Sequence, residues 1–164
     1  VQYFEGEYDN NKVSICKIFT SLNYSIVPIE HIEIYCANND MTVFDLVSQY
    51  DSYSYHMMNI VDYLVGNTDR HWGNWGFLVD NSNNKIAKLF PLMDFNKAFN
   101  SYDTLDGVKC QTTPKTMSQL EAAVEAVKAV GLNQIHEVKK EWFGSEEQYN
   151  MFCRRLNVLK QNLI

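Results

Sequence analysis

The middle of the chain places a helix, a polar loop and a hairpin in immediate succession. Apolar residues recur at helical spacing on one face of residues 53–65, and Gly66-Asn67 ends that helix. A loop crowded with charged and amide side chains follows. Residues 75–95 then read as two short strands around a turn at residues 81–84. Polar groups inserted between segments that read as core call for a functional explanation.

The spacing within the polar loop suits phosphoryl transfer. Asp69 and Asn74 stand five positions apart, which is the D-x-x-x-x-N spacing of a kinase catalytic loop. Such a carboxylate orients the attacking hydroxyl, and a neutral amide oxygen binds a metal ion without adding a full charge. The hairpin then returns the chain and delivers Asp94, a second carboxylate for a metal that bridges phosphate oxygens. Phe95 follows as in D-F-G, although Asn96 replaces the glycine.

Each of these residues has a simpler interpretation when taken alone. Asp69 is a common capping or turn residue, Asn74 is a common turn residue, and Asp94 can begin a turn after a strand. His71 alone is more often a buried, hydrogen-bonded imidazole than a metal ligand. The joint order of helix end, Asp, Asn, hairpin and Asp-Phe favours the phosphotransfer interpretation.

The segment "DYLVGNTDRHWGNWGFLVDN…LFPLMDF" resembles the C-terminal lobe of HipA-like serine/threonine protein kinases, most strongly over residues 61–99. The resemblance implies ATP as the phosphoryl donor and a protein as the substrate. It also implies that Asp69 is the catalytic base, that Asn74 is a magnesium ligand and that Asp94 is the principal magnesium ligand. His71 would pack and hydrogen-bond within the loop. Phosphoinositide lipid kinases share the pattern Asp-Arg-His-x-x-Asn, so a lipid acceptor is an alternative.

The flanking segments predict an α+β fold, mainly a helical kinase-like C-lobe with a catalytic-loop β-hairpin and a short N-terminal β segment. Thr42, Ser118 and Ser145 are candidate caps of further helices. Residues 100–116 are polar and without periodicity, so we expect a loop there that serves as an activation or substrate-docking segment.

Residues 1–36 are expected to be the end of the N-lobe strands and the hinge, and residues 37–164 the C-lobe. Residues 24–36 are rich in β-formers, although Pro28 limits them to an edge strand or an irregular extended segment. Within this hinge, the candidate adenine-contacting residues are Glu33, Ile34, Tyr35 and Cys36.

A phosphate-binding lysine and a glycine-rich loop are not recognisable in the sequence, and the chain starts at Val1 rather than Met. We therefore expect the rest of the N-lobe to lie upstream or on a partner chain, and we expect the isolated fragment to be inactive. Exposure of the surface that docks the N-lobe would favour a homo-oligomer. A non-catalytic, partner-binding kinase-like module is the alternative.

The composition excludes some classes of function. The chain has 164 residues, with 14 basic and 20 acidic side chains and a net charge of −6. A nucleic-acid surface needs an excess of cations, so we expect no nucleic-acid partner. No apolar run approaches the roughly 20 residues that span a bilayer, so we expect no membrane partner. Four cysteines without a C-x-x-C pair indicate reduced thiols and a cytoplasmic protein.

Overall fold

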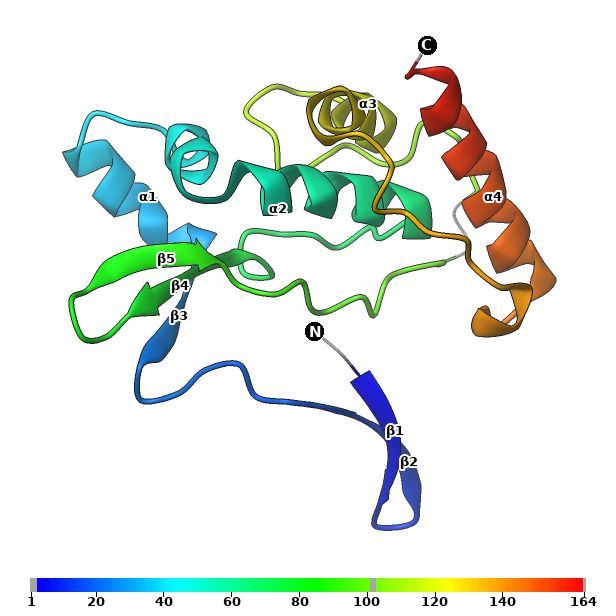
Figure 1. Ribbon diagram of the computed structural model, residues 1–164, viewed down its shortest axis with the longest axis horizontal. Helices are drawn as coiled ribbons and strands as arrows, with labels where there is room; N and C mark the ends of the chain where they lie inside the picture. The colour runs from blue at the N-terminus through cyan, green and yellow to red at the C-terminus, as the bar shows by residue number, and fades with distance from the viewer. Residues whose placement is uncertain (1–2, 101–102, 164) are drawn as a thin grey trace.

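Four α-helices and two antiparallel sheets make up residues 3–100 and 103–163, the part of the chain that this computed structural model describes (Figure 1). The predicted α+β fold, dominated by helix, is therefore confirmed. A single 3-10 turn, Lys140–Trp142, precedes the last helix. In chain order the elements are β1 (Tyr3–Tyr8), β2 (Asn11–Cys16), β3 (Tyr24–Pro28), α1 (Ile29–Asn38), α2 (Val43–Val65), β4 (Gly76–Asp80), β5 (Lys85–Leu89), α3 (Gln119–Val130) and α4 (Glu146–Gln161).

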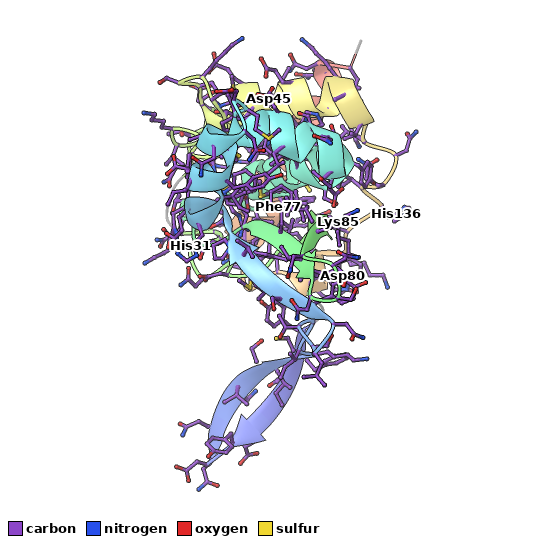
Figure 2. All side chains as sticks on the ribbon, turned by 90° about the vertical axis from the view of Figure 1, so that its left-hand side faces the viewer. His31, Asp45, Phe77, Asp80, Lys85 and His136 are labelled. Atoms are coloured by element: carbon purple, nitrogen blue, oxygen red, sulfur yellow. The ribbon has the colours of Figure 1, made fainter. Side chains whose placement is uncertain are left out.

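The N-terminal hairpin projects away from the helical body in both views (Figures 1 and 2). β1 pairs with β2 from Tyr3 opposite Cys16 to Tyr8 opposite Asn11. Its turn residues Asp9 and Asn10 both have positive φ, at 51° and 58°, which matches the twist of a two-residue hairpin. The strands expected at this end of the chain are confirmed.

The second sheet has the order β3-β4-β5, and the hairpin predicted after the polar loop forms its β4 and β5. Figure 2 shows Phe77 inside the body, whereas Asp80 and Lys85 flank the exposed turn of that hairpin. Gly76 faces β3 so closely that a Cβ there would lie 2.3 Å from the Val27 carbonyl oxygen. Only glycine permits this approach of the two strands.

The extended conformation expected over residues 24–36 is wrong beyond Pro28. Pro28 ends β3 and precedes α1, the helix in which Glu33, Ile34, Tyr35 and Cys36 lie. The apolar positions that decide this conformation follow helical rather than alternating spacing: Ile29, Ile32 and Cys36 are buried, whereas Ile34 is 73% exposed. The boundary predicted after residue 36 falls inside this helix, and the assignment of residues to lobes stays a prediction.

α2 contains the two helices that the sequence predicts, joined at a kink. Asp51 has non-helical backbone angles (φ −159°, ψ 61°), and its carboxylate accepts from the Ser54 backbone N–H at 3.1 Å and from Leu89 N–H at 3.2 Å. The kink residue therefore caps the second half of the helix and fixes it to β5. At the start of α2, Thr42 and Asp45 form a capping box.

α2 runs between two clusters of buried side chains and belongs to both. One cluster joins α1, the first half of α2 and the β3-β4-β5 sheet around Leu46, Trp75 and Phe77. The other joins the second half of α2 to α3 and α4 around Tyr63, Ala126 and Leu159. The chain between α2 and β4 thus starts and ends on packed elements, which makes it a rigidly held loop.

The last two helices begin at the predicted caps. Ser118 and Glu121 form the expected capping box, and Gly131 ends α3. The face of α3 that is buried against α2 is made largely of alanine, whereas Val124 and Val130 are only partly buried. In α4, Arg155 is buried and Leu163 beyond the helix is 47% exposed. Among the described residues, no helix is long and apolar enough to cross a membrane.

Candidate active site

The polar loop leaves α2 through a left-handed glycine. Gly66 has φ 60° and ψ 42°, and its N–H bonds back to the carbonyls of the last helical turn. Asn67 continues this turn, since its backbone N–H donates to the Asp62 carbonyl at 2.9 Å. A side chain at Gly66 would meet the buried Arg155 guanidinium, with Nη1 2.5 Å from the added Cβ. The predicted helix end at Gly66-Asn67 is confirmed, and it turns the chain into the loop.

A buried ion pair organises the loop from within. The side chains of Asp62 and Arg70 are 5% and 3% exposed, and the Arg70 Nε donates to Asp62 Oδ2 at 2.8 Å. A second bond runs from Arg70 Nη2 to Asp62 Oδ1 at 3.0 Å, which makes the pair bidentate. Asn67 Nδ2 also donates to Asp62 Oδ1, at 2.9 Å. The Asp62 carboxylate, on α2, thus holds both the start and the middle of the loop.

Asp69 and Asn74 are connected directly. The Asn74 side-chain Nδ2 donates to the Asp69 backbone carbonyl at 2.9 Å, and Asn74 is buried. Its backbone N–H donates to the His71 carbonyl at 2.9 Å. Within residues 3–100 and 103–163, no hydrogen bond engages the Asn74 Oδ1 or the Asp69 carboxylate, so both oxygen groups are free for a ligand.

Asp94 reaches the same region after the hairpin. Its backbone lies in the left-handed region, with φ 56°, a conformation that Asp tolerates better than most residues. It is half-buried, and no hydrogen bond or ion pair holds its carboxylate within the described ranges 3–100 and 103–163. The preceding residue, Met93, is bound through its carbonyl by Arg70 Nη1 at 2.7 Å. The same nitrogen binds the Asn74 carbonyl at 3.0 Å, so the structure brings the two predicted metal ligands together through one guanidinium.

His71 differs from its implied packing role. The ring is exposed, and its Nδ1 accepts from the Gly73 backbone N–H at 3.1 Å. The hydrogen bond within the loop agrees with the expectation, whereas the burial does not. A neutral ring that accepts at Nδ1 carries its proton on Nε2. The turn is tight, since a Cβ at Gly73 would lie 3.0 Å from the His71 Cε1.

Helix α1 contains the candidate adenine-contacting residues, so they do not lie in an extended segment: Glu33, Ile34, Tyr35 and Cys36. Backbone N–H and C=O groups inside a helix bind one another and are not available to a purine ring. Glu33 and Cys36 instead line a pocket of about 430 Å³ with Trp72 and Pro114. Burial is the main cause that raises the pKa of the Cys36 thiol, which favours its neutral form. Their assignment as adenine contacts stays a prediction, and inside a helix only their side chains are available for such contacts.

The segment after Asp94 is anchored to both α2 and the loop. The Tyr55 hydroxyl donates to the Thr112 carbonyl at 2.9 Å, and Trp72 Nε1 donates to the Gln111 carbonyl at 3.0 Å. The Thr112 hydroxyl bonds to Asn59, and Thr112 is buried. Burial also raises the pKa of Tyr55 to about 12, so its hydroxyl remains a donor. Of the loop expected over residues 100–116, residues 101–102 lie outside the described part.

Sequence reasoning missed Asp62, the acid that pairs with Arg70. A signal for it existed: Asp62 is the one carboxylate in residues 53–65 and stands between Val61 and Tyr63 in a segment rich in apolar residues. A charged residue at such a position requires a buried partner. Gln119, the first residue of α3, was missed as well, and its side chain donates to the Asn67 carbonyl at 2.5 Å.

Comparison with known proteins places the sequence in a family. The sequence matches the family model described as phosphatidylinositol 3- and 4-kinase over residues 7–152. The chain belongs to the phosphatidylinositol 3- and 4-kinase family. The kinase-like fold that the sequence predicts is confirmed for this family member, whereas the narrower HipA-like class is not shown.

Two further matches of this phosphatidylinositol 3- and 4-kinase family member agree with a kinase-like fold. Over 134 residues the chain is 31% identical to the serine/threonine-protein kinase CtkA of Helicobacter pylori (strain J99), a match that covers 73% of this chain and 40% of CtkA. The crystal structure of a Helicobacter pylori proinflammatory kinase CtkA has a TM-score of 0.60 at 19% identity, covering 98% of this chain and 71% of that chain. The family member thus spans less than half of the curated relative.

Proposed function

We propose that this chain carries the catalytic loop and the metal-binding residues of an ATP-dependent kinase that phosphorylates a serine or threonine hydroxyl of a protein. The observation that carries the proposal is a set of three oxygen groups, on Asp69, Asn74 and Asp94, that accept no hydrogen bond from any residue that the structure describes. Two of them lie on segments that Arg70 binds through neighbouring carbonyls. Acceptors that the described residues leave unbonded are open to a ligand.

The donor set fits magnesium bound together with phosphates. Among the described residues there is no group of three or more His, Cys, Asp or Glu side chains that would hold a metal alone. An amide oxygen from Asn74 and a carboxylate from Asp94 match the usual magnesium site, which takes one or two carboxylates and completes its shell with water and phosphate oxygens. Magnesium held by Asn74 and Asp94 would offset the negative charge of the ATP phosphates.

Asp69 is suited to receive the proton of the acceptor hydroxyl. Its carboxylate has no hydrogen-bond or ion-pair partner among residues 3–100 and 103–163, so both oxygens are available to the substrate. As the acceptor oxygen bonds to the γ-phosphorus, the bond from that phosphorus to the bridging oxygen of ADP breaks and the hydroxyl proton passes to Asp69. The Asn74 bond to the Asp69 carbonyl fixes the backbone that carries this carboxylate.

The nature of the acceptor distinguishes two versions of this function. The printed name of CtkA, serine/threonine-protein kinase, supports a protein acceptor. The name of the matching family supports phosphatidylinositol as the second candidate. A net charge of −6 weakens attraction to anionic lipid surfaces, so we favour the protein acceptor, with action in the cytoplasm. Membership of the HipA-like class is part of the same proposal.

The test supplies the full-length protein with γ-labelled ATP and magnesium, once with serine- and threonine-containing protein and once with phosphatidylinositol vesicles. We expect label in protein and none in the lipid extract, and no label in either with Asp69→Asn. Label confined to lipid would reject the protein acceptor. Equal labelling by the Asp69→Asn variant would reject the proposed role of Asp69.

A further inference from the structure

We propose that Arg70 is the positioning residue of this site, setting the metal-ligand segments that carry Asn74 and Asp94 at their mutual distance. This inference rests on the proposed function and adds a role that the motif spacing does not assign. Asn74 belongs to the loop after α2, and Asp94 lies beyond the β4–β5 hairpin. The hairpin brings the two segments together as far as Phe90, whose N–H donates to the Gly76 carbonyl at 2.9 Å, and Asp94 lies four residues further on. A contact beyond the paired strands is needed to set the two ligand segments against each other.

One nitrogen makes the connection. Arg70 Nη1 donates to the Asn74 carbonyl at 3.0 Å and to the Met93 carbonyl at 2.7 Å, so it uses both of its protons on the two segments. The guanidinium carbon also lies 4.9 Å from the centre of the Phe95 ring. Arg70 therefore contacts the residues on both sides of Asp94.

The guanidinium is held in a single orientation from the opposite side. Asp62 binds Nε at 2.8 Å and Nη2 at 3.0 Å, and α2 carries that carboxylate. A planar group with two fixed edges has no remaining rotational freedom. Because Asp62 lies on α2, that helix sets the direction of Nη1. The position of Nη1 then fixes the two segments that carry the metal ligands.

A lysine at position 70 cannot make the same set of hydrogen bonds. An ammonium supplies one charged point on a flexible stem, whereas the guanidinium offers five N–H groups in a fixed fork. Arg70→Lys keeps the positive charge beside Asp62 but cannot bind the carboxylate bidentately and both carbonyls together. The Arg70→Lys variant therefore distinguishes whether the site needs only a positive charge beside Asp62 or also needs the hydrogen bonds that position the two ligand segments.

The first test measures amide hydrogen exchange in the full-length protein without metal or nucleotide. We expect Arg70→Lys to accelerate exchange of residues 91–97 by at least about tenfold, with α3 unchanged, because the segment around Asp94 loses its anchor. Unchanged exchange over residues 91–97 would overturn the proposal, as would uniform acceleration over the whole protein. Neither result depends on whether the protein binds ATP.

Two further variants keep the test decisive. Asp62→Leu combined with Arg70→Met removes the buried pair as a unit, which proteins tolerate better than loss of one partner. We expect this double variant to fold and to show the same local acceleration. The matched control is Arg155→Lys, which alters another buried arginine, one that binds the Tyr63 and Thr104 carbonyls. Its residues 91–97 should exchange as in the wild type, and acceleration there equal to that of Arg70→Lys would overturn the assignment.

A second readout connects positioning to the metal. Mn²⁺, titrated by electron paramagnetic resonance in the presence of ATP, replaces magnesium as the probe. We expect Arg70→Lys to raise the apparent dissociation constant for Mn²⁺ by about 10- to 100-fold, the range for loss of a supporting residue. An unchanged constant would overturn the positioning role. Absence of binding by the wild type would instead reject the proposed function, while the exchange experiment still decides what Arg70 holds.

Discussion

The side chain of Asn74 binds the backbone carbonyl of Asp69, with 2.9 Å between Nδ2 and the oxygen. This bond makes the two ends of the D-x-x-x-x-N spacing one structural unit. It also fixes the amide orientation: the nitrogen serves the fold, which leaves the oxygen for a ligand. The five-residue spacing is therefore a property of the loop's own geometry as well as of its chemistry.

Replacement of Asn74 by Asp tests this bond. Aspartate cannot donate to the Asp69 carbonyl, and it places a buried charge against that oxygen. We expect Asn74→Asp to lower the free energy of unfolding by about 1–3 kcal/mol in metal-free buffer, measured by chemical denaturation. The exposed Asn96→Asp is the control. Equal stability of the Asn74→Asp variant and the wild type would show that the bond does not hold the loop.

Asp69 should contribute to the reaction and not to the fold. Its carboxylate has no hydrogen bond within the described residues, so Asp69→Asn should leave the melting temperature unchanged. If Asp69 is the proton acceptor, as we propose, its loss should lower the turnover of the full-length protein by about 10²- to 10⁴-fold. Steady-state kinetics with saturating ATP measures the effect. A variant that melts well below the wild type would indicate a structural role for Asp69.

Gly76 should tolerate no side chain, because the obstruction is backbone. A Cβ there would lie 2.3 Å from the Val27 carbonyl oxygen and 2.7 Å from the Pro28 Cα. Gly76→Ala must push β3 away from β4, and we expect it to lower the free energy of unfolding by about 1–3 kcal/mol. Gly144→Ala is the control, since its Cβ would meet only the end of the flexible Gln148 side chain, at 3.1 Å. Similar losses in both variants would argue against the strand contact.

His56 predicts how stability changes with pH. Burial lowers the pKa of His56 from its ordinary value of 6.5, although the charge of Glu125 opposes this shift. The folded protein then binds fewer protons than the unfolded chain just below pH 6.5. The contribution of neutral His56 to the free energy of unfolding should therefore be complete above pH 6.5. It should be lost as the pH drops from there through the folded pKa of His56.

Denaturation curves between pH 5 and 8 measure this dependence, and His56→Gln should flatten it. His136→Gln changes an exposed histidine and should leave it as in the wild type. A pH dependence that survives His56→Gln intact would assign it to another group.

Much of the fold can be predicted from local sequence signals. The caps at Thr42, Ser118 and Ser145 and the glycines after α2 and α3 mark helix ends through contacts within a few residues. The β4–β5 hairpin likewise follows from its alternation and its polar turn. Each of these depends on neighbours in the chain, which a sequence displays directly.

The errors have physical causes beyond local signals. Residues 29–36 contain β-branched side chains that suggest a strand, yet α1 buries Ile29, Ile32 and Cys36 against α2 and the sheet. Tertiary packing decided that segment over propensity. The pairing of Asp62 with Arg70 joins a helix to a loop through a buried contact, and pattern spacing alone does not reveal it.

Within the site, the motif located the three oxygen groups but not their support. Asp69, Asn74 and Asp94 stand out because the spacing of kinase motifs is fixed by chemistry. Arg70 lay inside the same motif without an assigned task, since its partners come from α2 and from beyond the hairpin. The residues that hold a site depend on the whole fold.

The most direct measurement is Mn²⁺ binding by the full-length protein in the presence of ATP, followed by electron paramagnetic resonance, for the wild type and for Asp94→Asn. The wild type should bind Mn²⁺ with nucleotide, and Asp94→Asn should raise the dissociation constant by at least about tenfold. Asp103→Asn, a change at an exposed carboxylate that pairs with Arg154, should bind as the wild type does. Equal dissociation constants for Asp94→Asn and the wild type would contradict a metal site at Asn74 and Asp94.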